Sequence, residues 1–159
     1  CIRRARNDWD VTVYLEPGEA CALNAGYLLT RVLDVVQNGD TTVAILDASA
    51  ACHMPDVIEM PYRPPLLAAG EKDERPCTVR LAGPTCLAGD VIGDYSFDAV
   101  PAVGDLLVFG DMAIYTTCKN NTFNGMPLPA IFARRADGTI HKTVSFGYED
   151  FKRRLGSPQ

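Results

Sequence analysis

The sequence predicts a mainly β protein with short helical pieces at its two ends. Several segments are rich in β-branched and aromatic residues, which are typical of strands. Two turn signals, Asn38-Gly39-Asp40 and Asp137-Gly138, separate pairs of such segments and predict hairpins. A third turn, at Gly83-Pro84, lies between further strand-like segments. With 159 residues the chain is long enough for one domain with its own core.

The expected elements follow from these patterns in order. The helices are a polar, arginine-rich tail over 1–9, a tightly packed piece rich in small residues over 20–26, and a terminal helix over 148–155. The strands are expected over 11–15, 27–36, 42–46, 77–81, 106–109, 111–117, 131–135 and 139–144, mostly antiparallel. The Ala- and Pro-rich residues 47–65 predict turns, and 71–75 a solvated charged loop.

Composition and charge exclude several classes of function. Apolar residues make up 47% of the chain, charged residues 22%, and the net charge is −5. This composition indicates a soluble globular protein and argues against a nucleic-acid partner, which would favour a basic face. No apolar run approaches the length of a membrane span. We therefore expect neither a nucleic acid nor a membrane as a partner.

The six cysteines show no C-x-x-C spacing, which predicts neither a metal site nor a disulfide framework. They are interpreted as reduced thiols of a cytoplasmic protein. No charged-then-apolar leader is present, so no secretory signal is expected. The chain begins at Cys1 without an initiator Met, which indicates a piece of a longer chain or a trimmed one.

Two short stretches carry candidate chemistry. The loop Gly83–Asp90 places the Cys86 thiol and a carboxylate between two predicted strands, where binding and catalysis are often found. A tight turn with a buried thiol explains it equally well. Glu16-Pro17-Gly18 puts a carboxylate at the end of a predicted strand, as at the active-site edge of a β/α barrel. A simple turn with a solvated Glu16 is the alternative. For His53 we favour a structural, hydrogen-bonded role over acid–base chemistry.

Four motifs in order resemble the C-terminal part of the fold-type III pyridoxal-phosphate (PLP) decarboxylases, which include ornithine, diaminopimelate and carboxynorspermidine decarboxylases. The motifs are Glu16-Pro17-Gly18, residues 22–32, Gly83-Pro84-Thr85-Cys86, and Ala113-Ile114-Tyr115 followed by Thr122-Phe123-Asn124-Gly125. Within the family, the chain is most similar to carboxynorspermidine/carboxyspermidine decarboxylases. Glu19 stands where other members carry Arg, residues 47–56 match, and the acid near Cys86 is displaced to Asp90.

The resemblance implies a two-part organisation. Family members have an N-terminal β/α barrel that holds PLP on a lysine, followed by a C-terminal antiparallel β-barrel domain. Residues 1–26 are then the last helix and strand of the barrel, and 27–159 the β-barrel domain. A β/α barrel needs roughly 200 residues or more and does not fit in this chain. The lysines match no family lysine motif, so we expect the fragment alone to be inactive; they are Lys72, Lys119, Lys142 and Lys152.

The resemblance also assigns roles around PLP. Glu16 would pair with the ring nitrogen of PLP, and Gly18 and Tyr115 would bind the cofactor. Glu19 cannot hold the phosphate as Arg does, so phosphate binding would rest on Tyr115 and on glycines of the barrel. Cys86 would act as the general acid that protonates the substrate carbon after CO2 leaves. Because family members donate this cysteine from the partner subunit, a homodimer with an active site at its interface is implied.

Further residues would bind the substrate, a carboxylated polyamine. Asp90 and Glu59 would pair with its distal ammonium groups, Phe123 would line its chain, and Asn124 would order the loop. The implied reaction converts carboxynorspermidine or carboxyspermidine to norspermidine or spermidine plus CO2, in polyamine biosynthesis. Two alternatives remain open: a non-catalytic β-domain binding module or pseudo-subunit, and a sibling decarboxylase acting on ornithine, arginine or diaminopimelate.

Overall fold

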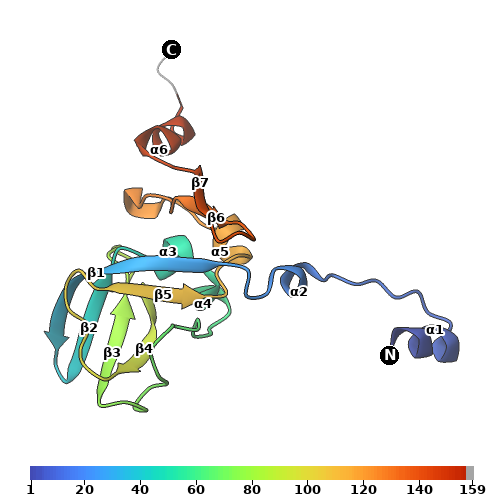
Figure 1. Cartoon of the computed structure of the whole chain (residues 1–159), viewed down its shortest axis with the longest axis horizontal. Helices are drawn as coiled ribbons and strands as arrows, with labels where there is room; N and C mark the ends of the chain where they lie inside the picture. Colours follow the sequence, from blue (N-terminus) through green and yellow to red (C-terminus); the bar gives the residue numbers. More distant parts are fainter. Residues whose placement is uncertain (157–159) are drawn as a thin grey trace.

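The computed structural model describes residues 1–156, and it is built around a curled five-stranded sheet (Figure 1). The strands lie in the order β4-β3-β2-β1-β5. Their bounds are β1 (Tyr27–Asn38), β2 (Thr41–Leu46), β3 (Cys77–Ala82), β4 (Val91–Phe97) and β5 (Leu106–Gly110). The expected mainly β fold is confirmed, with one correction. β2 and β3 pair in parallel, whereas every other pair in this sheet is antiparallel.

The long strand β1 explains why the sheet curls. Its first half, Tyr27–Arg31, pairs with β5, and its second half pairs with β2 as far as Asn38 opposite Thr41. A bulge between Val32 and Asp34 lies where one partner gives way to the other, and bulges bend strands. The predicted hairpin turn after β1 is confirmed, since Gly39 adopts φ +57°, which glycine accommodates without strain.

A short segment joins the two edges of the sheet. Along β5, the Leu67 N–H donates to the Val108 carbonyl at 2.9 Å, and the Gly110 N–H donates to the Pro65 carbonyl at 2.8 Å. Along β4, Gly70 and Ser96 exchange backbone hydrogen bonds of 2.8 and 3.2 Å. Residues 65–70 therefore cover both open edges and help to close the curled sheet around a core.

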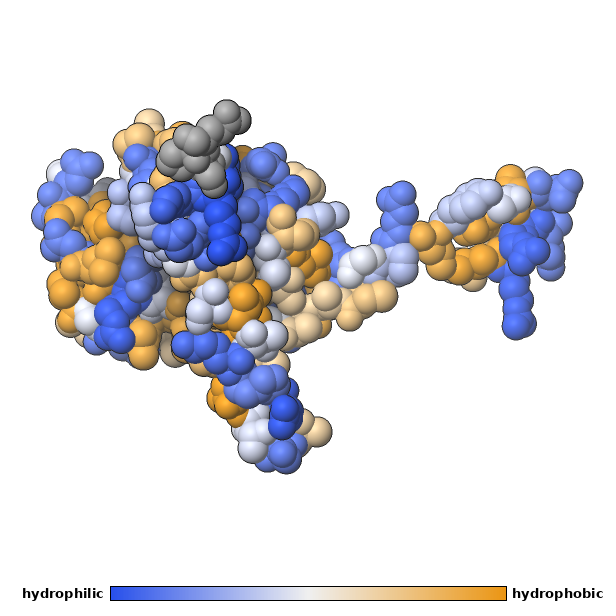
Figure 2. Space-filling model, turned by 90° about the horizontal axis from the view of Figure 1, so that it is seen from above, coloured by the Kyte–Doolittle hydropathy of each residue, from blue (hydrophilic) through white to orange (hydrophobic). Residues whose placement is uncertain are grey.

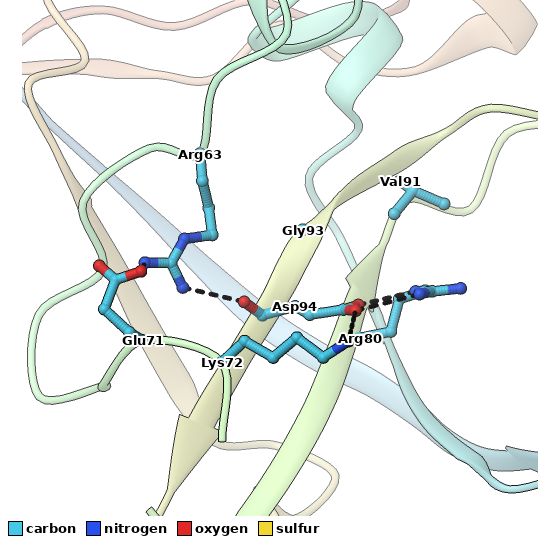
Figure 3. A pocket seen from close by; sticks show the side chains of 7 residues that line it. All are labelled: Arg63, Glu71, Lys72, Arg80, Val91, Gly93 and Asp94. Atoms are coloured by element: carbon cyan, nitrogen blue, oxygen red, sulfur yellow. Dashed lines mark hydrogen bonds and ion pairs between the residues drawn. The ribbon is translucent and has the colours of Figure 1, made fainter. Parts of the chain in front are cut away.

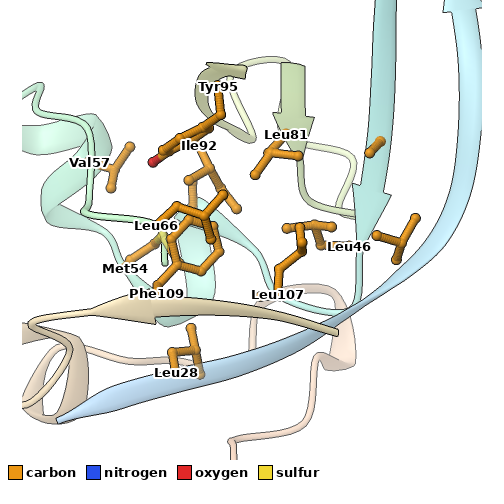
Figure 4. Close-up of a cluster of buried hydrophobic side chains, with 14 of the residues drawn as sticks. Leu28, Leu46, Met54, Val57, Leu66, Leu81, Ile92, Tyr95, Leu107 and Phe109 are labelled. Atoms are coloured by element: carbon orange, nitrogen blue, oxygen red, sulfur yellow. The ribbon is translucent and has the colours of Figure 1, made fainter. Parts of the chain in front are cut away.

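The core fills the inside of this curl (Figure 4). Phe109 is fully buried, and its ring meets that of Tyr95 edge-on, with centroids 6.1 Å apart. The Tyr95 hydroxyl donates to the Pro64 carbonyl at 2.7 Å, so the buried oxygen is satisfied. Alternate residues of β1, such as Leu28 and Val32, point into the same core.

The N-terminal arm projects from this body (Figures 1 and 2). Its helices α1 (Ile2–Trp9) and α2 (Gly18–Ala22) have no buried residue. The expected helical tail is confirmed, but the expected tight packing of the 20–26 piece is wrong. The expected strand over 11–15 is also wrong in this chain, because residues 10–17 form neither helix nor strand. A strand needs a neighbour for its backbone hydrogen bonds, and Tyr14 is 87% exposed.

Short helices replace several predicted turns and strands. The crossover from β2 to β3 contains α3 (Ala50–His53) and α4 (Asp56–Glu59). The expected strand over 111–117 is wrong. Asp111 takes φ +56° and ends β5, and the chain then enters α5 (Tyr115–Cys118) and the 3-10 helix η1 (Phe123–Gly125). β4 begins directly after Asp90, where no strand was expected.

The C-terminal part matches its prediction. β6 (Ile131–Arg134) and β7 (Ile140–Val144) form a separate antiparallel hairpin, with φ +85° at Gly138 in the turn, and α6 (Tyr148–Arg154) follows. Within residues 1–156, no helix has both the length and the apolar character that a membrane crossing requires.

Candidate active site

The loop Gly83–Asp90 connects β3 to β4 and presents Cys86 to solvent. The loop is held by its own backbone. The Gly83 N–H donates to the Asp90 carbonyl at 2.8 Å, and the Asp90 N–H donates to the Leu87 carbonyl at 3.0 Å. The Cys86 thiol is exposed, so the alternative of a buried thiol at this turn is wrong.

Asn124 holds the thiol of Cys86. The side-chain Oδ1 of Asn124 accepts from the Cys86 thiol at 3.2 Å and from the Cys86 backbone N–H at 3.3 Å. Asn124 has φ +56°, a left-handed conformation that Asn tolerates better than most residues. Its neighbour Phe123 is 45% exposed. The structure therefore brings three of the predicted residues, Cys86, Phe123 and Asn124, to one place.

Asp90 lies inside the protein rather than at the surface. The residue is only 4% exposed, and its side chain accepts from the Thr85 hydroxyl at 2.6 Å and the Ser49 hydroxyl at 2.9 Å. The backbone N–H groups of Thr85 and Ala51 donate to it at 3.2 and 3.3 Å. This placement corrects the expectation that Asp90 faces the substrate, because both carboxylate oxygens already bind internal donors.

Ser49 is a residue that the sequence reasoning missed. It caps the N-terminus of α3, where its hydroxyl oxygen accepts from the Cys52 N–H at 3.1 Å while its proton goes to Asp90. The signal was present, since Ser ahead of an Ala-rich run is typical of an N-cap. Its long-range partner Asp90 carries no comparable local signal.

His53 is a structural residue, as we favoured. The Ser49 N–H donates to its Nδ1 at 3.1 Å, which leaves the ring proton on Nε2, 3.0 Å from the Pro127 carbonyl oxygen. Burial lowers the pKa of His53 and favours this neutral form. Both ring nitrogens therefore bind the backbone and are not free for acid–base chemistry.

Tyr115 and Glu59 both contact the side chain of Lys119. Tyr115 on α5 is 50% exposed, and the Lys119 ammonium lies 4.7 Å from the centre of its ring. The same ammonium is 2.5 Å from Asp56 Oδ1 and 2.9 Å from Glu59 Oε2, and these contacts raise the pKa of Lys119. Glu59, which was expected to pair with a substrate ammonium, thus already contacts one from its own chain.

Glu16 and Gly18 lie on the N-terminal arm. Among the described residues, the Glu16 side chain makes no hydrogen bond or ion pair and none joins it to the Cys86 loop. The arm joins the body next to the segment that leads to Tyr115. There the Met112 N–H donates to the Gly26 carbonyl at 2.9 Å, and the Asn24 N–H donates to Asp111 at 2.7 Å.

A charged cleft of about 370 Å³ lies elsewhere on the sheet (Figure 3). Arg80 binds Asp94 through two hydrogen bonds of 2.7 and 3.0 Å, which lower the pKa of Asp94, and Arg63 pairs with Glu71. Because these charges satisfy one another and no predicted site residue lines the cleft, it is a poorer candidate than the Cys86 loop. The described residues contain no cluster with metal-ligand character.

Comparisons with known proteins agree on one family. The model of "Pyridoxal-dependent decarboxylase, C-terminal sheet domain" matches residues 11–113. The carboxyaminopropylagmatine decarboxylase of Synechocystis is 46% identical over 89% of this chain. The carboxynorspermidine/carboxyspermidine decarboxylase of Campylobacter jejuni is 40% identical over 92%. A crystal structure of carboxynorspermidine decarboxylase from C. jejuni, complexed with norspermidine, covers 94% of the chain with a TM-score of 0.82 and 39% identity.

These relatives are much longer than the chain described here. It spans 37% and 41% of the two curated relatives and 43% of the C. jejuni crystal chain. The match therefore concerns less than half of each relative, and the family model that matches describes a C-terminal sheet domain.

Proposed function

The chain belongs to the pyridoxal-dependent decarboxylase family, and we propose that it is the C-terminal part of a carboxylated-polyamine decarboxylase. The full-length enzyme would convert carboxynorspermidine or carboxyspermidine to norspermidine or spermidine plus CO2, in polyamine biosynthesis. One observation carries this proposal. Three relatives of 36–46% identity, each matching about nine tenths of the chain, are named as decarboxylases of such carboxylated amines.

The exposed residues of the chain fit a PLP site. PLP supplies an electron sink for the electrons that remain when CO2 leaves. The Glu16 carboxylate would keep the ring nitrogen protonated, because a nearby negative charge favours the protonated form. The Tyr115 hydroxyl and the backbone at Gly18 would contact the phosphate. Supporting this, Glu16 and Tyr115 are exposed, and neither side chain has a hydrogen-bond partner within residues 1–156.

The lysine that attaches PLP would lie outside this chain. Each lysine here has an aromatic or acidic partner within the described residues: Lys72 with Asp94, Lys119 with Asp56 and Glu59, Lys142 over Phe132, and Lys152 with Glu149. A missing barrel would also cover the apolar side chains of the arm, of which Trp9 is 75% exposed. We therefore propose residues 1–26 as barrel and 27–159 as β-domain, with residues 157–159 outside the described range.

Cys86 would donate the proton that replaces CO2 on the substrate carbon. Its thiol is solvent-exposed, and the neutral oxygen of Asn124 orients the S–H. Within residues 1–156, no hydrogen bond or ion pair joins Glu16 to the Cys86 loop, which supports an active site that would take Glu16 from one subunit and Cys86 from the other. This arrangement requires a homodimer. Six free thiols are compatible with a cytoplasmic enzyme, which we also propose.

The substrate chain would lie against Phe123, whose half-exposed ring neighbours Asn124. Glu59 binds Lys119 through Oε2, yet its side chain is 56% exposed. It would attract an ammonium group of the polyamine, as it attracts that of Lys119.

A second candidate substrate is carboxyaminopropylagmatine, which the 46% identity to the Synechocystis enzyme favours. An assay of CO2 release from the full-length, PLP-loaded protein separates the candidates. The substrates are carboxynorspermidine, carboxyspermidine, carboxyaminopropylagmatine, ornithine, arginine and diaminopimelate. Turnover of a carboxylated polyamine supports the proposal. Turnover of ornithine, arginine or diaminopimelate alone contradicts it, and no turnover of any substrate favours the non-catalytic module.

Two substitutions test the assigned roles. Cys86→Ala should lower kcat at least about tenfold while PLP stays bound, because the proton donor is lost. Cys77→Ala is the matched control, since Cys77 begins β3 and the Cys86 loop follows its other end. Equal turnover in the two variants would remove Cys86 from the mechanism. Glu16→Gln should weaken the cofactor's absorbance signature and turnover together.

A further inference from the structure

We propose that Asp90 is the positioning residue for Cys86: it fixes the loop Gly83–Asp90 to the N-terminus of α3, so that the thiol meets Asn124. The inference rests on the proposed function of Cys86 as proton donor. It replaces the substrate contact expected for Asp90 with an indirect role.

The donors around Asp90 come from two separate parts of the chain. Thr85, the residue before Cys86, contributes its hydroxyl at 2.6 Å and its backbone N–H at 3.2 Å. Ser49 and Ala51, at the start of α3, contribute a hydroxyl at 2.9 Å and a backbone N–H at 3.3 Å. A carboxylate on a residue that is only 4% exposed needs such partners, so it links the loop firmly to the helix.

The start of the loop is shaped around this carboxylate. A Cβ atom at Gly83 would lie 2.2 Å from Asp90 Oδ2 and 2.6 Å from Oδ1. Only glycine lets the backbone pass this close. The loop therefore encloses the carboxylate at its first residue, at Thr85 and at Asp90 itself.

The same helix also holds the residues that precede Asn124, namely Asn121 and Phe123. The Asn121 side-chain amide donates to the Ala51 carbonyl at 2.8 Å, and the Asn121 N–H donates to the Cys52 carbonyl at 2.9 Å. The Cys52 thiol donates to the Phe123 carbonyl at 3.5 Å. The two partners, Cys86 and Asn124, are thus both anchored on α3, and Asp90 supplies the anchor on the cysteine side.

The test uses Asp90→Asn in the full-length, PLP-loaded enzyme, because Asn keeps the size but cannot accept from every donor. Asp94→Asn is the matched control: Asp94 lies on the same strand, β4, and the substitution removes one of its two hydrogen bonds from Arg80 without touching the loop. We expect Asp90→Asn to lower kcat about tenfold or more at nearly unchanged KM and PLP content. Alkylation of Cys86 by iodoacetamide, followed by peptide mass spectrometry, should accelerate several-fold. Asp94→Asn should change neither quantity.

A second variant and a double mutant complete the test. If Asp90→Asn does not fold, Thr85→Val removes one donor and should change the same two quantities to a smaller degree. In the Cys86→Ala background, Asp90→Asn should cause no further loss of kcat. The inference would be overturned if the two substitutions lowered kcat independently of each other. It would also be overturned if the Asp90→Asn enzyme had a normal kcat and a normal rate of Cys86 alkylation.

The outcomes separate this inference from the proposed function. Suppose that Cys86→Ala slows turnover and that Asp90→Asn lowers kcat further in the Cys86→Ala background. The proposed function then stands and the positioning role fails. If Cys86→Ala leaves turnover unchanged, the proposed role of Cys86 fails. In that case, only the alkylation rate of Cys86 in the Asp90→Asn variant tests the positioning role.

Discussion

Gly83→Ala should destabilise the protein, because the added methyl group would clash with the carboxylate of Asp90. The new methyl carbon would lie 2.2 Å from Asp90 Oδ2, where a non-bonded contact prefers about 3.5 Å. The carboxylate would have to retreat by roughly 1 Å, which breaks its hydrogen bonds to Thr85 or Ser49. Losing two bonds to a charged group costs about 3 kcal/mol or more. For a domain of this size, the unfolding midpoint falls by about 6–12 °C.

The same loop provides the control for this prediction. A Cβ atom at Gly89 would meet nothing within 4 Å, so Gly89→Ala should change the unfolding free energy by no more than about 0.5 kcal/mol. Urea and thermal unfolding of the full-length variants measure both effects. In an Asp90→Ala background, Gly83→Ala should lower the unfolding free energy hardly at all, because the carboxylate with which it clashes is gone. Equal costs for the two glycine variants, or the same Gly83→Ala cost in both backgrounds, would refute the reasoning.

Three further predictions concern the body of the fold. Because burial lowers the pKa of His53, the unfolded chain binds that proton more readily, and the unfolding free energy should fall as the pH drops below about 6.5. His53→Asn keeps an acceptor for the Ser49 N–H and should flatten this slope in urea titrations; an unchanged slope would contradict the assignment. The hydrogen bond to Arg80 lowers the pKa of Asp94, so the pair stabilises the fold above about pH 4 and loses this effect as the pH falls through the lowered value. The gap in unfolding free energy between the wild type and Arg80→Met should therefore narrow on acidification, and a gap that widens would count against the pair. Phe109→Ala should lower the unfolding free energy by about 3–5 kcal/mol, because the ring is fully buried. Thermal melts followed by circular dichroism measure this loss, and a clearly smaller one would contradict the prediction.

The hairpins and the terminal helix could be predicted from the sequence because their signals are local. Turns that need φ > 0 favour glycine, and Gly39 and Gly138 adopt such angles where the two hairpins were expected. The arginine-rich tail over 1–9 and the helix near 148–155 were likewise predicted from short patterns. The motifs around Cys86 and Asn124 also identified the family, which the comparisons confirm.

The errors lie where distant residues decide the outcome. Residues 11–15 have strand-like side chains, but no neighbouring strand within residues 1–156 pairs with them. The sequence neighbours of Tyr115 favour a strand, yet β5 ends before Asp111, which has a positive φ, and the chain then forms α5. The parallel pairing of β2 with β3 joins strands across a long crossover, and no local residue pattern encodes that choice.

The amino-acid sequence by itself determined the turn positions, the residue types of the candidate site and the family to which the chain belongs. Tertiary structure alone decided that Asp90 is buried, that Ser49 and Thr85 surround it, and that Cys86 meets Asn124. The physical reason is that a turn depends on the backbone preferences of a few adjacent residues. The setting of a carboxylate depends instead on which donors the folded chain brings to it from dozens of residues away.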